Sequence, residues 1–321
     1  MDSPCPSKAA LQVCLGPLVL KNPILCASGT FGYGEEMEGF VDPGLYGAIV
    51  GKSISLHPRK GNPLPRVVET ASGMLNSIGL QNPGLEAFVS TYLPRMRKYD
   101  TTLVVNLVGD TVEEYVAMAE RLSGEGGVDA LELNISCPNC PAGGMEFGID
   151  PRATEILVGK VRERFPRPLI AKLTPNVTDI VSVARAAEAG GADALSLVNT
   201  YLGLAVDWKR RRALLGGVTG GLSGPAIKPL ALRCVWAVAK ATRIPVVGIG
   251  GIMTSSDVLE FMVAGASAVQ LGTVHFVEPR AIVGILEDLE RVLCEEGLAS
   301  IQDLVGTLKA ERRPITVSCE G

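Results

Sequence analysis

Two lysines stand where a cationic side chain is unusual, at the ends of short apolar runs. Lys52 closes the run Ala-Ile-Val-Gly-Lys, and Lys172 lies within Leu-Ile-Ala-Lys-Leu. A buried lysine is costly unless an anion or a strong acceptor compensates its charge. Two such cations can face an electron-rich ring system that takes up negative charge. Either ammonium group alone can instead reach solvent from a strand end, and Lys172 can also serve as a Schiff-base lysine of the aldolase type.

Asparagines lie in or just after other apolar runs of the same kind. Asn106, Asn134 and Asn199 can offer amide donors and acceptors to a planar heterocycle. Each asparagine alone can equally cap a loop, but an aldolase would not explain all three. Together with the lysines they favour a flavin, whose pyrimidine side needs positive charge when it accepts a hydride.

Glycines that close the last two apolar runs are typical of a phosphate site. Gly250-Gly251 and Gly272-Thr273 follow the runs 245–249 and 268–271. Glycine lets backbone N–H groups approach a phosphate closely. One pair alone would indicate a tight turn, whereas both pairs together favour phosphate binding. Met253 occupies the third glycine position of the dinucleotide fingerprint, so no NAD site is predicted on this chain.

Cys137 lies in Asn-Ile-Ser-Cys-Pro-Asn, at the end of an apolar run that enters a Gly- and Pro-rich loop. With Cys140 it forms a C-x-x-C, which can be a redox dithiol or half of a metal site. The chain has no second pair to complete a four-cysteine site and only two histidines, so we predict no metal. We favour Cys137 as a lone thiolate base whose pKa nearby cations lower.

These residues share one placement, because each lies toward the end of a short β-rich apolar run or just after it. Helical patterns separate most of the runs. Alternating strands and helices predict a parallel sheet. Eight strands favour closure into an α/β (β/α)8 TIM barrel of about 250 residues plus decorations, with an open doubly wound sheet as the alternative. The eight runs are 24–28, 48–52, 103–108, 130–135, 169–173, 194–198, 245–249 and 268–271.

Helices are predicted over 178–189, 225–240, 255–263 and 279–293, and another from a capping box at Asp110 and Glu113 through Glu120. We expect an N-terminal hairpin before the barrel. Two connections, 56–84 and 201–224, are too long for turns and are expected as functional loops on the C-terminal face. We predict one domain over 1–321, with a loosely packed tail over about 310–321.

Composition agrees with a large buried core, since 47% of the residues are hydrophobic and 20% charged. The net charge of −4 argues against nucleic-acid binding. No apolar run reaches the roughly 18 residues of a membrane-spanning helix. Gly16 and Pro17 interrupt the apolar stretch 9–20, so no signal peptide is predicted and we expect a cytoplasmic protein.

From about Leu11 to Leu308 the chain resembles the catalytic subunit of class 1B dihydroorotate dehydrogenases. The matching stretches are Ala27-Ser-Gly-Thr-Phe-Gly-Tyr-Gly34, Gly61-Asn-Pro-x-Pro-Arg66, Asn76-Ser-Ile-Gly-Leu-Gln-Asn-Pro83, Leu131-Glu-Leu-Asn-Ile-Ser-Cys-Pro-Asn139, Lys172-Leu-Thr-Pro-Asn-Val-Thr-Asp179, Thr219-Gly-Gly-Leu-Ser-Gly-Pro225, Gly248-Ile-Gly-Gly-Ile252 and Gly265-Ala-Ser-Ala-Val-Gln270.

The resemblance implies oxidation of dihydroorotate to orotate in pyrimidine biosynthesis. Cys137 would take the proton from C5, while C6 gives a hydride to N5 of FMN. Lys52 would contact both the flavin and the substrate carboxylate. The other implied substrate contacts are Asn76, Ser77, Ile78, Gly79, Leu80, Asn134, Asn199 and Thr200. The other implied FMN contacts are Ser28, Ser53, Asn106, Asn134, Lys172, Val198 and Gly224, with Gly250, Gly251, Gly272 and Thr273 at the phosphate.

The B type further implies a partner subunit that carries FAD and a 2Fe-2S cluster and passes electrons to NAD. The expected assembly is a heterotetramer around a homodimer of catalytic chains. The chain departs from the family at Cys140-Pro-Ala, where a Val and a Lys are expected. The basic run 209–212 is read as a solvated face, with a place near the partner or the active-site entrance as the alternative.

Two other functions stay open. A dihydropyrimidine dehydrogenase-like subunit would share the barrel and reduce uracil or thymine, but Cys137-Pro-Asn and the 76–80 segment favour dihydroorotate. A flavin- or phosphate-binding barrel without turnover belongs to a different class. Polar, cationic or glycine residues at all eight strand ends argue against it.

Overall fold

Eight parallel strands close into a barrel in this computed structural model, which describes residues 10–135 and 147–309. Each predicted run overlaps one barrel strand, so the predicted (β/α)8 barrel is confirmed. Pairing of Val269 with Ile24 closes the ring between the last strand and the first. The strands, in order around the barrel, are β3 (Ile24–Cys26), β4 (Ala48–Val50), β7 (Thr102–Leu107), β8 (Ala130–Asn134), β9 (Leu169–Lys172), β10 (Ala194–Leu197), β15 (Val246–Ile249) and β16 (Ala268–Leu271).

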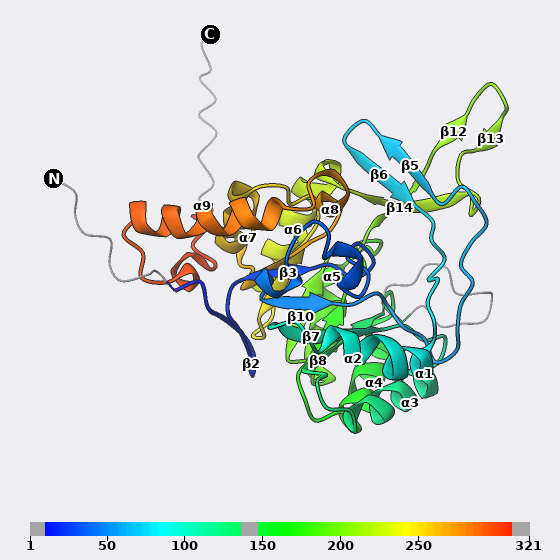
Figure 1. Ribbon diagram of the computed structural model, residues 1–321, viewed down its shortest axis with the longest axis horizontal. Coiled ribbons are helices and arrows are strands. Elements are labelled where there is room, and N and C mark those ends of the chain that lie inside the picture. Colours follow the sequence, from blue (N-terminus) through cyan, green and yellow to red (C-terminus); the bar gives the residue numbers. More distant parts are fainter. Residues whose placement is uncertain (1–9, 136–146, 310–321) are drawn as a thin grey trace, which may run out of the picture.

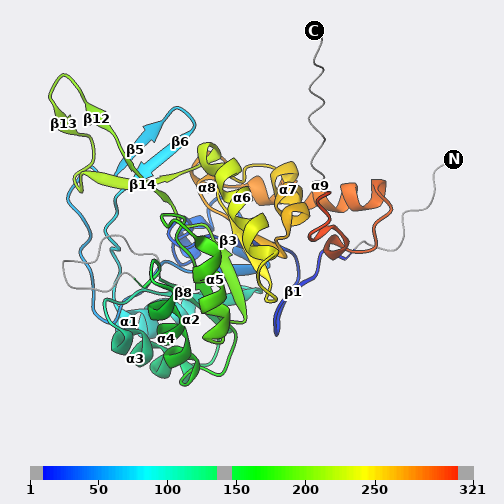
Figure 2. The ribbon, with the colours of Figure 1, turned by 180° about the vertical axis from the view of Figure 1, so that it is seen from behind.

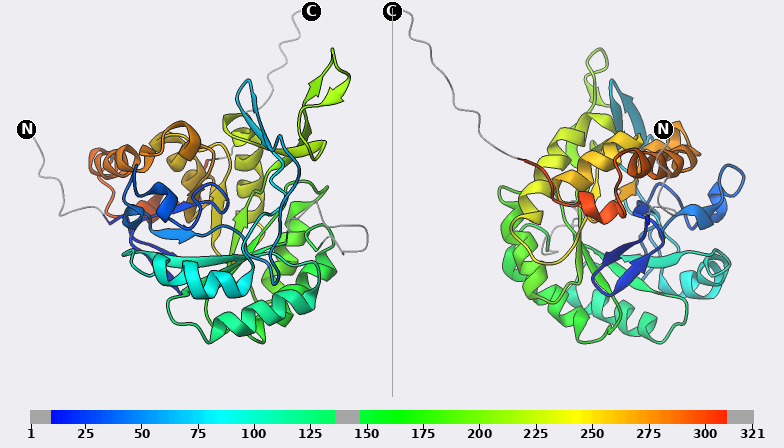
Figure 3. Two further views of the ribbon diagram at one scale, coloured as in Figure 1. Left: turned by 45° about the vertical axis from the view of Figure 1, so that its right-hand side comes forward. Right: turned by 90° about the vertical axis from the view of Figure 1, so that its left-hand side faces the viewer.

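Helices surround the strands on the outside of the barrel (Figure 3). Nearly every residue of the eight strands is buried, as expected when one face packs on helices and the other fills the barrel. The longer helices are α3 (Val112–Ser123), α4 (Pro151–Arg162), α5 (Ile180–Ala189), α6 (Lys228–Ala239), α7 (Ser255–Ala264) and α9 (Ala281–Glu295). The short ones are α1 (Leu85–Ala87), α2 (Leu93–Met96), α8 (Val274–Val277), η1 (Glu35–Met37), η2 (Pro43–Leu45), η3 (Phe88–Tyr92), η4 (Pro225–Ile227) and η5 (Ile301–Leu304).

The predicted start of α3 is wrong by one residue. Thr111, not Asp110, is the N-cap, and its hydroxyl accepts from the Glu114 N–H. The Glu114 carboxylate in turn accepts from the Asp110 N–H at 2.7 Å. A threonine and an aspartate are both good N-caps, so the sequence alone does not rank the two adjacent positions.

Opposite ends of the barrel carry different additions (Figure 1). The expected N-terminal hairpin is present, because β1 (Val13–Leu15) pairs antiparallel with β2 (Leu18–Leu20).

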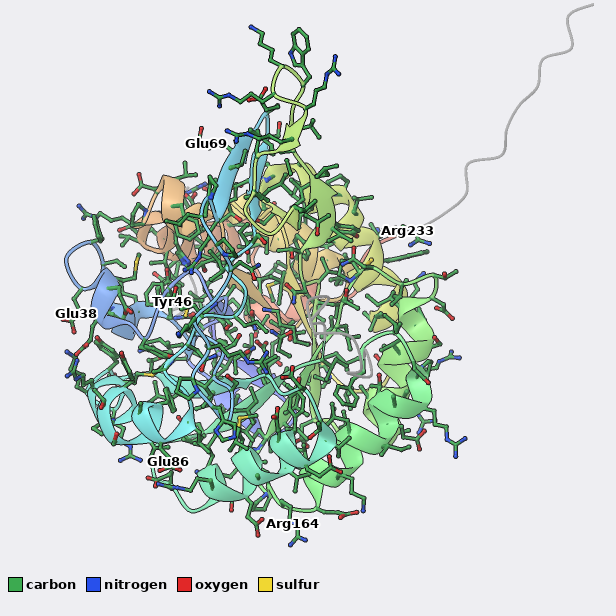
Figure 4. All side chains as sticks on the ribbon, turned by 90° about the vertical axis from the view of Figure 1, so that its right-hand side faces the viewer. Glu38, Tyr46, Glu69, Glu86, Arg164 and Arg233 are labelled. Atoms are coloured by element: carbon green, nitrogen blue, oxygen red, sulfur yellow. The ribbon has the colours of Figure 1, made fainter. Side chains whose placement is uncertain are left out.

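Charged side chains such as Glu86, Arg164 and Arg233 lie at the periphery, whereas Tyr46 lies in the interior (Figure 4). No helix in the described ranges is long and apolar enough to cross a membrane.

The two long connections are not irregular loops but pair with each other. They form a four-stranded antiparallel sheet in the order β11 (Tyr201–Leu204), β14 (Thr219–Ser223), β6 (Gly73–Asn76) and β5 (Val67–Thr70). A further hairpin of β12 (Val206–Asp207) and β13 (Arg212–Ala213) projects beyond this sheet (Figure 2). The connecting pairs, such as Asn76 with Gly221, join residues far apart in the chain, which local patterns do not reveal.

Candidate active site

A large cavity lies between the carboxyl ends of the barrel strands and the four-stranded sheet. Its empty volume, including the open solvent at its mouth, is about 1540 Å³. Most of the predicted site residues lie in its wall. They are Ser28, Lys52, Ser53, Asn76, Ser77, Ile78, Gly79, Leu80, Asn134, Lys172, Val198, Asn199, Thr200, Gly224, Gly250, Gly251, Gly272 and Thr273.

Glycines shape one end of this cavity. Gly250 and Gly251 follow β15 with φ values of 130° and 75°, and Gly224 has a φ of 95°. A Cβ on Gly251 would lie 2.9 Å from the carbonyl oxygen of Gly224, too close for any other residue. The Thr273 hydroxyl donates to Ser223 Oγ at 2.8 Å. Bare backbone and hydroxyl groups at strand ends seven and eight are the usual phosphate-binding chemistry of this fold.

The two lysines share the floor of the cavity, but their surroundings differ. Lys172 Nζ lies 3.8 Å from Oε1 of Glu132. Lys52 makes no ion pair or hydrogen bond with a described residue, and a Cβ on Gly29 would lie 3.4 Å from its Nζ. Burial lowers the pKa of Lys52 below the ordinary lysine value, and the charge of Lys172 lowers it further. The cavity therefore holds a cation that an anionic ligand can neutralise.

Glu132 is a buried residue that the sequence analysis did not single out. It lies in the middle of β8 and is fully buried. Its oxygens accept from Asn106 Nδ2 at 2.6 Å, Ser196 Oγ at 2.7 Å and Gln270 Nε2 at 2.7 Å. Glutamate in the fully apolar run Ala-Leu-Glu-Leu was the signal that could have identified it. Asn106, predicted as a flavin contact, is fully buried beside Glu132 and is absent from the cavity wall.

Asn82, which lies just outside the predicted substrate segment 76–80, forms hydrogen bonds that hold the end of this segment. Asn82 Oδ1 accepts from the N–H groups of Ser55 and Gly84 at 3.1 and 2.9 Å. Its Nδ2 donates to Ser55 Oγ and to the Leu80 carbonyl, both at 2.8 Å. Leu80 has a φ of 57°, which a leucine rarely adopts. Asn82 therefore fixes the end of this segment in an unusual conformation.

Amide groups that follow or end three barrel strands also line the cavity. Asn199 Nδ2 lies 3.4 Å from Asn134 Oδ1, and the Thr200 N–H donates to Asn199 Oδ1 at 2.8 Å. Asn176, which also lines the cavity, donates through Nδ2 to the Thr200 carbonyl at 3.0 Å. In the sequence, Asn176 stands out only as part of the family motif 172–179, so its place in the cavity wall was not predicted.

Ser28 and Ser53 meet at the ends of the first two barrel strands, with 3.2 Å between their hydroxyl oxygens.

Cys137 and Cys140 lie outside the described residues, as does the predicted tail 310–321. The donor set fits FMN in two respects. Glycine backbone suits its phosphate, and two lysines suit a ring that takes up negative charge.

Comparisons with known proteins agree with this geometry. Residues 10–293 match the family model described as dihydroorotate dehydrogenase. The chain is similar to proteins named dihydroorotate dehydrogenase B (NAD(+)), catalytic subunit. The Trichlorobacter lovleyi protein is 53% identical over 302 residues, covering 94% of this chain and 99% of the relative. The Geobacter sulfurreducens protein has the same identity and coverage, and the Desulforudis audaxviator protein is 51% identical over 299 residues, or 93% and 97% of the two chains.

Fold and relatives together define an oxidoreductase of the (β/α)8-barrel class. The chain belongs to the dihydroorotate dehydrogenase family.

Proposed function

We propose that this chain is a catalytic subunit that oxidises (S)-dihydroorotate to orotate, with FMN in the cavity at the carboxyl ends of the strands. The observation that carries the proposal is the convergence of Lys52 and Lys172 on the same cavity as the glycines that follow β15 and β16. Family membership supports the substrate, and the charges and glycines support the cofactor. Gly224, Gly250, Gly251, Gly272 and Thr273 would hold its phosphate end, and Lys172 its ring.

The reaction removes one proton and one hydride from neighbouring carbons, and a C5–C6 double bond forms. When bound, FMN supplies the acceptor for the hydride from C6. Cys137, as a thiolate, takes the proton from C5 and becomes a neutral thiol. Lys52 neutralises the substrate carboxylate. This anion would offset the burial and the charge of Lys172, both of which lower the pKa of Lys52. Segment 76–80 with Asn134, Asn199 and Thr200 holds the pyrimidine ring.

The electrons then leave the chain for NAD+ through a second subunit. The relatives' names, which include NAD(+) and catalytic subunit, support this part of the proposal. We further propose that the partner carries FAD and a 2Fe-2S cluster, that two catalytic chains form the core of a heterotetramer, and that the assembly is cytoplasmic. Within it, residues 1–321 form one FMN-binding domain.

An anaerobic titration of the purified chain with dihydroorotate, followed by flavin absorbance, tests the proposal. We expect a yellow protein whose flavin band bleaches. Cys137→Ser should retain FMN but reduce it about 10²–10⁴-fold more slowly, since that is the usual contribution of a general base. Cys140→Ser, which changes the other cysteine of the same motif, should reduce at the wild-type rate.

Other outcomes contradict separate parts of the proposal. A yellow protein that stays oxidised with dihydroorotate but reacts with a dihydropyrimidine overturns the substrate. Equal rates for Cys137→Ser and the wild type overturn the base. A chain that takes up no FMN, alone or with its partner, overturns the cofactor.

A further inference from the structure

Glu132 connects residues from five barrel strands at the floor of the cavity. It lies on β8 and contacts Asn106 on β7, Lys172 on β9, Ser196 on β10 and Gln270 on β16. Three of these contacts are hydrogen bonds of 2.6 to 2.7 Å. Glu132, Asn106, Ser196 and Gln270 are all fully buried. Among the described residues, no other carboxylate contacts either lysine of the floor.

The ion pair between Lys172 and Glu132 lowers the net positive charge at the floor of the cavity. Lys172 and Glu132 are buried and close enough to compensate each other, at 3.8 Å between Nζ and Oε1. Lys52 has no such anion among the described residues. The floor thus carries two positive charges and one negative charge. Charges in a low-dielectric site act more strongly than in water, so removing the negative charge would leave two uncompensated cations.

Glu132 also decides how two amide groups are oriented. An ionised carboxylate only accepts hydrogen bonds. Asn106 and Gln270 must therefore turn their NH₂ groups toward it, and their oxygens point away. Those two oxygens, Asn106 Oδ1 and Gln270 Oε1, are buried and have no hydrogen-bond partner among the described residues. The carboxylate therefore fixes the direction in which both amides face.

We propose that Glu132 is a positioning residue that neutralises Lys172 and orients Asn106 and Gln270, and thereby sets the positive charge that the flavin meets and its reduction potential. This inference rests on the proposed function, because it requires FMN in this cavity. Nearby charge is one of the means by which a protein tunes a flavin. With Glu132 ionised, the floor favours the reduced flavin less than two free lysines would.

The test measures the midpoint potential of bound FMN in the full-length holoprotein, by anaerobic reductive titration against a reference dye. Glu132→Gln keeps the side-chain size and removes the charge. Its new NH₂ group can donate to Gln270 if that amide turns and offers its now unpartnered oxygen. Ser196→Ala is the matched control, since it removes one hydrogen bond to Glu132 without a change of charge. The double variant Glu132→Gln/Lys172→Met removes both charges of the pair.

We expect Glu132→Gln to shift the oxidised-to-reduced ratio at a fixed potential about tenfold toward the reduced flavin, which is about 30 mV upward for a two-electron couple. Ser196→Ala should leave the potential unchanged. The double variant should lose this increase, because Lys172 is no longer present as an uncompensated cation. If Glu132→Gln does not fold, Lys172→Met alone is compared with the double variant. Lys172→Met keeps the negative charge of Glu132 and should therefore have the lower potential of the two.

Several results would overturn the inference. One is a Glu132→Gln protein with full FMN content and the wild-type potential, which would make Glu132 merely structural. Another is a double variant whose potential is as high as that of Glu132→Gln, which would show that the charge of Lys172 does not cause the increase. A wild-type chain without FMN would contradict the proposed function itself. The FMN content of the wild type is therefore measured before the variants are compared.

Discussion

His275 is a buried histidine that the proposed chemistry does not use. Its Nδ1 lies 3.0 Å from Thr30 Oγ1, and its Nε2 lies 2.9 Å from the Tyr46 hydroxyl. The Thr30 hydroxyl already donates to the Ala27 carbonyl at 3.0 Å. Its oxygen is therefore the acceptor for Nδ1–H, and Nε2 accepts from Tyr46. This neutral tautomer links the end of β3, where Thr30 lines the cavity, to α8 behind Thr273.

Acid should destabilise the protein through this histidine. Burial lowers the pKa of His275 to about 4 from its ordinary 6.5. Above pH 6.5 the ring is neutral whether the chain is folded or unfolded. As the pH falls from 6.5 to about 4, only the unfolded chain binds the proton, so stability is lost. The loss reaches roughly 3 kcal/mol, since one pKa unit is worth about 1.36 kcal/mol.

Chemical denaturation of the wild type and of His275→Gln, at pH 7 and at pH 4.5, measures this loss. The variant should lose less unfolding free energy between the two pH values. The control is His57→Gln, because His57 is exposed and is the chain's other histidine. An acid-dependent loss as large in His275→Gln as in the wild type would show that this ring does not titrate on unfolding.

At the scale of elements, Asn82 determines where segment 76–80 ends. Asn82→Ala would leave the buried N–H groups of Ser55 and Gly84 without their acceptor. Each such loss costs about 1–3 kcal/mol, so we expect about 3 kcal/mol less unfolding free energy. The KM for dihydroorotate should rise more than kcat falls, because we propose that the segment holds the pyrimidine ring and not the reacting atoms. Steady-state kinetics and denaturation measure both effects.

Asn82→Asp separates the contributions of this side chain. It keeps the acceptor for Ser55 and Gly84 but loses the donations to Ser55 Oγ and to the Leu80 carbonyl, and it sets a buried carboxylate against that carbonyl oxygen. It should therefore lose at least as much stability as Asn82→Ala and raise the KM. Unchanged KM in both variants would show that Leu80 keeps its conformation without Asn82.

At the scale of the whole molecule, stability should come from the closed barrel and its helices, not from the β12–β13 hairpin. Val206 and Trp208 are 54% and 76% exposed. The basic run 209–212 at the tip is exposed too, with Arg210 paired to Asp207, which agrees with a solvated face. Exposed residues contribute little to the free energy of unfolding.

Replacement of residues 206–213 by a two-residue Asn-Gly turn tests this. Ala205 and Leu214 already share a hydrogen bond of 2.9 Å from the Leu214 N–H, and Asn-Gly is the preferred tight hairpin turn. We expect the melting temperature to stay within about 2 °C of the wild type, with FMN content unchanged, by calorimetry and absorbance. Trp208→Ala is the milder comparison. A drop of 5 °C or more for the shortened chain would show that the hairpin packs on the barrel.

The sequence alone determined the barrel and most of the residues that line its cavity, because both depend on local patterns. A strand that is buried on both faces must be apolar over its whole length, and so the eight runs identified the eight strands. In a barrel of parallel strands all carboxyl ends meet on one face. Residues that follow the runs, such as Lys52, Asn199 and Gly250, therefore had to converge on one cavity, and they line it together.

Only the tertiary structure decided features that depend on contacts between distant segments. The four-stranded sheet needs Asn76 to pair with Gly221, and no local pattern encodes that register. Glu132 became evident only when closure of the ring brought Gln270 and Asn106 to its two sides. The same contacts keep Asn106 behind the cavity wall. Composition and spacing report burial and backbone conformation, whereas the partners of a buried charge are set by which strands become neighbours.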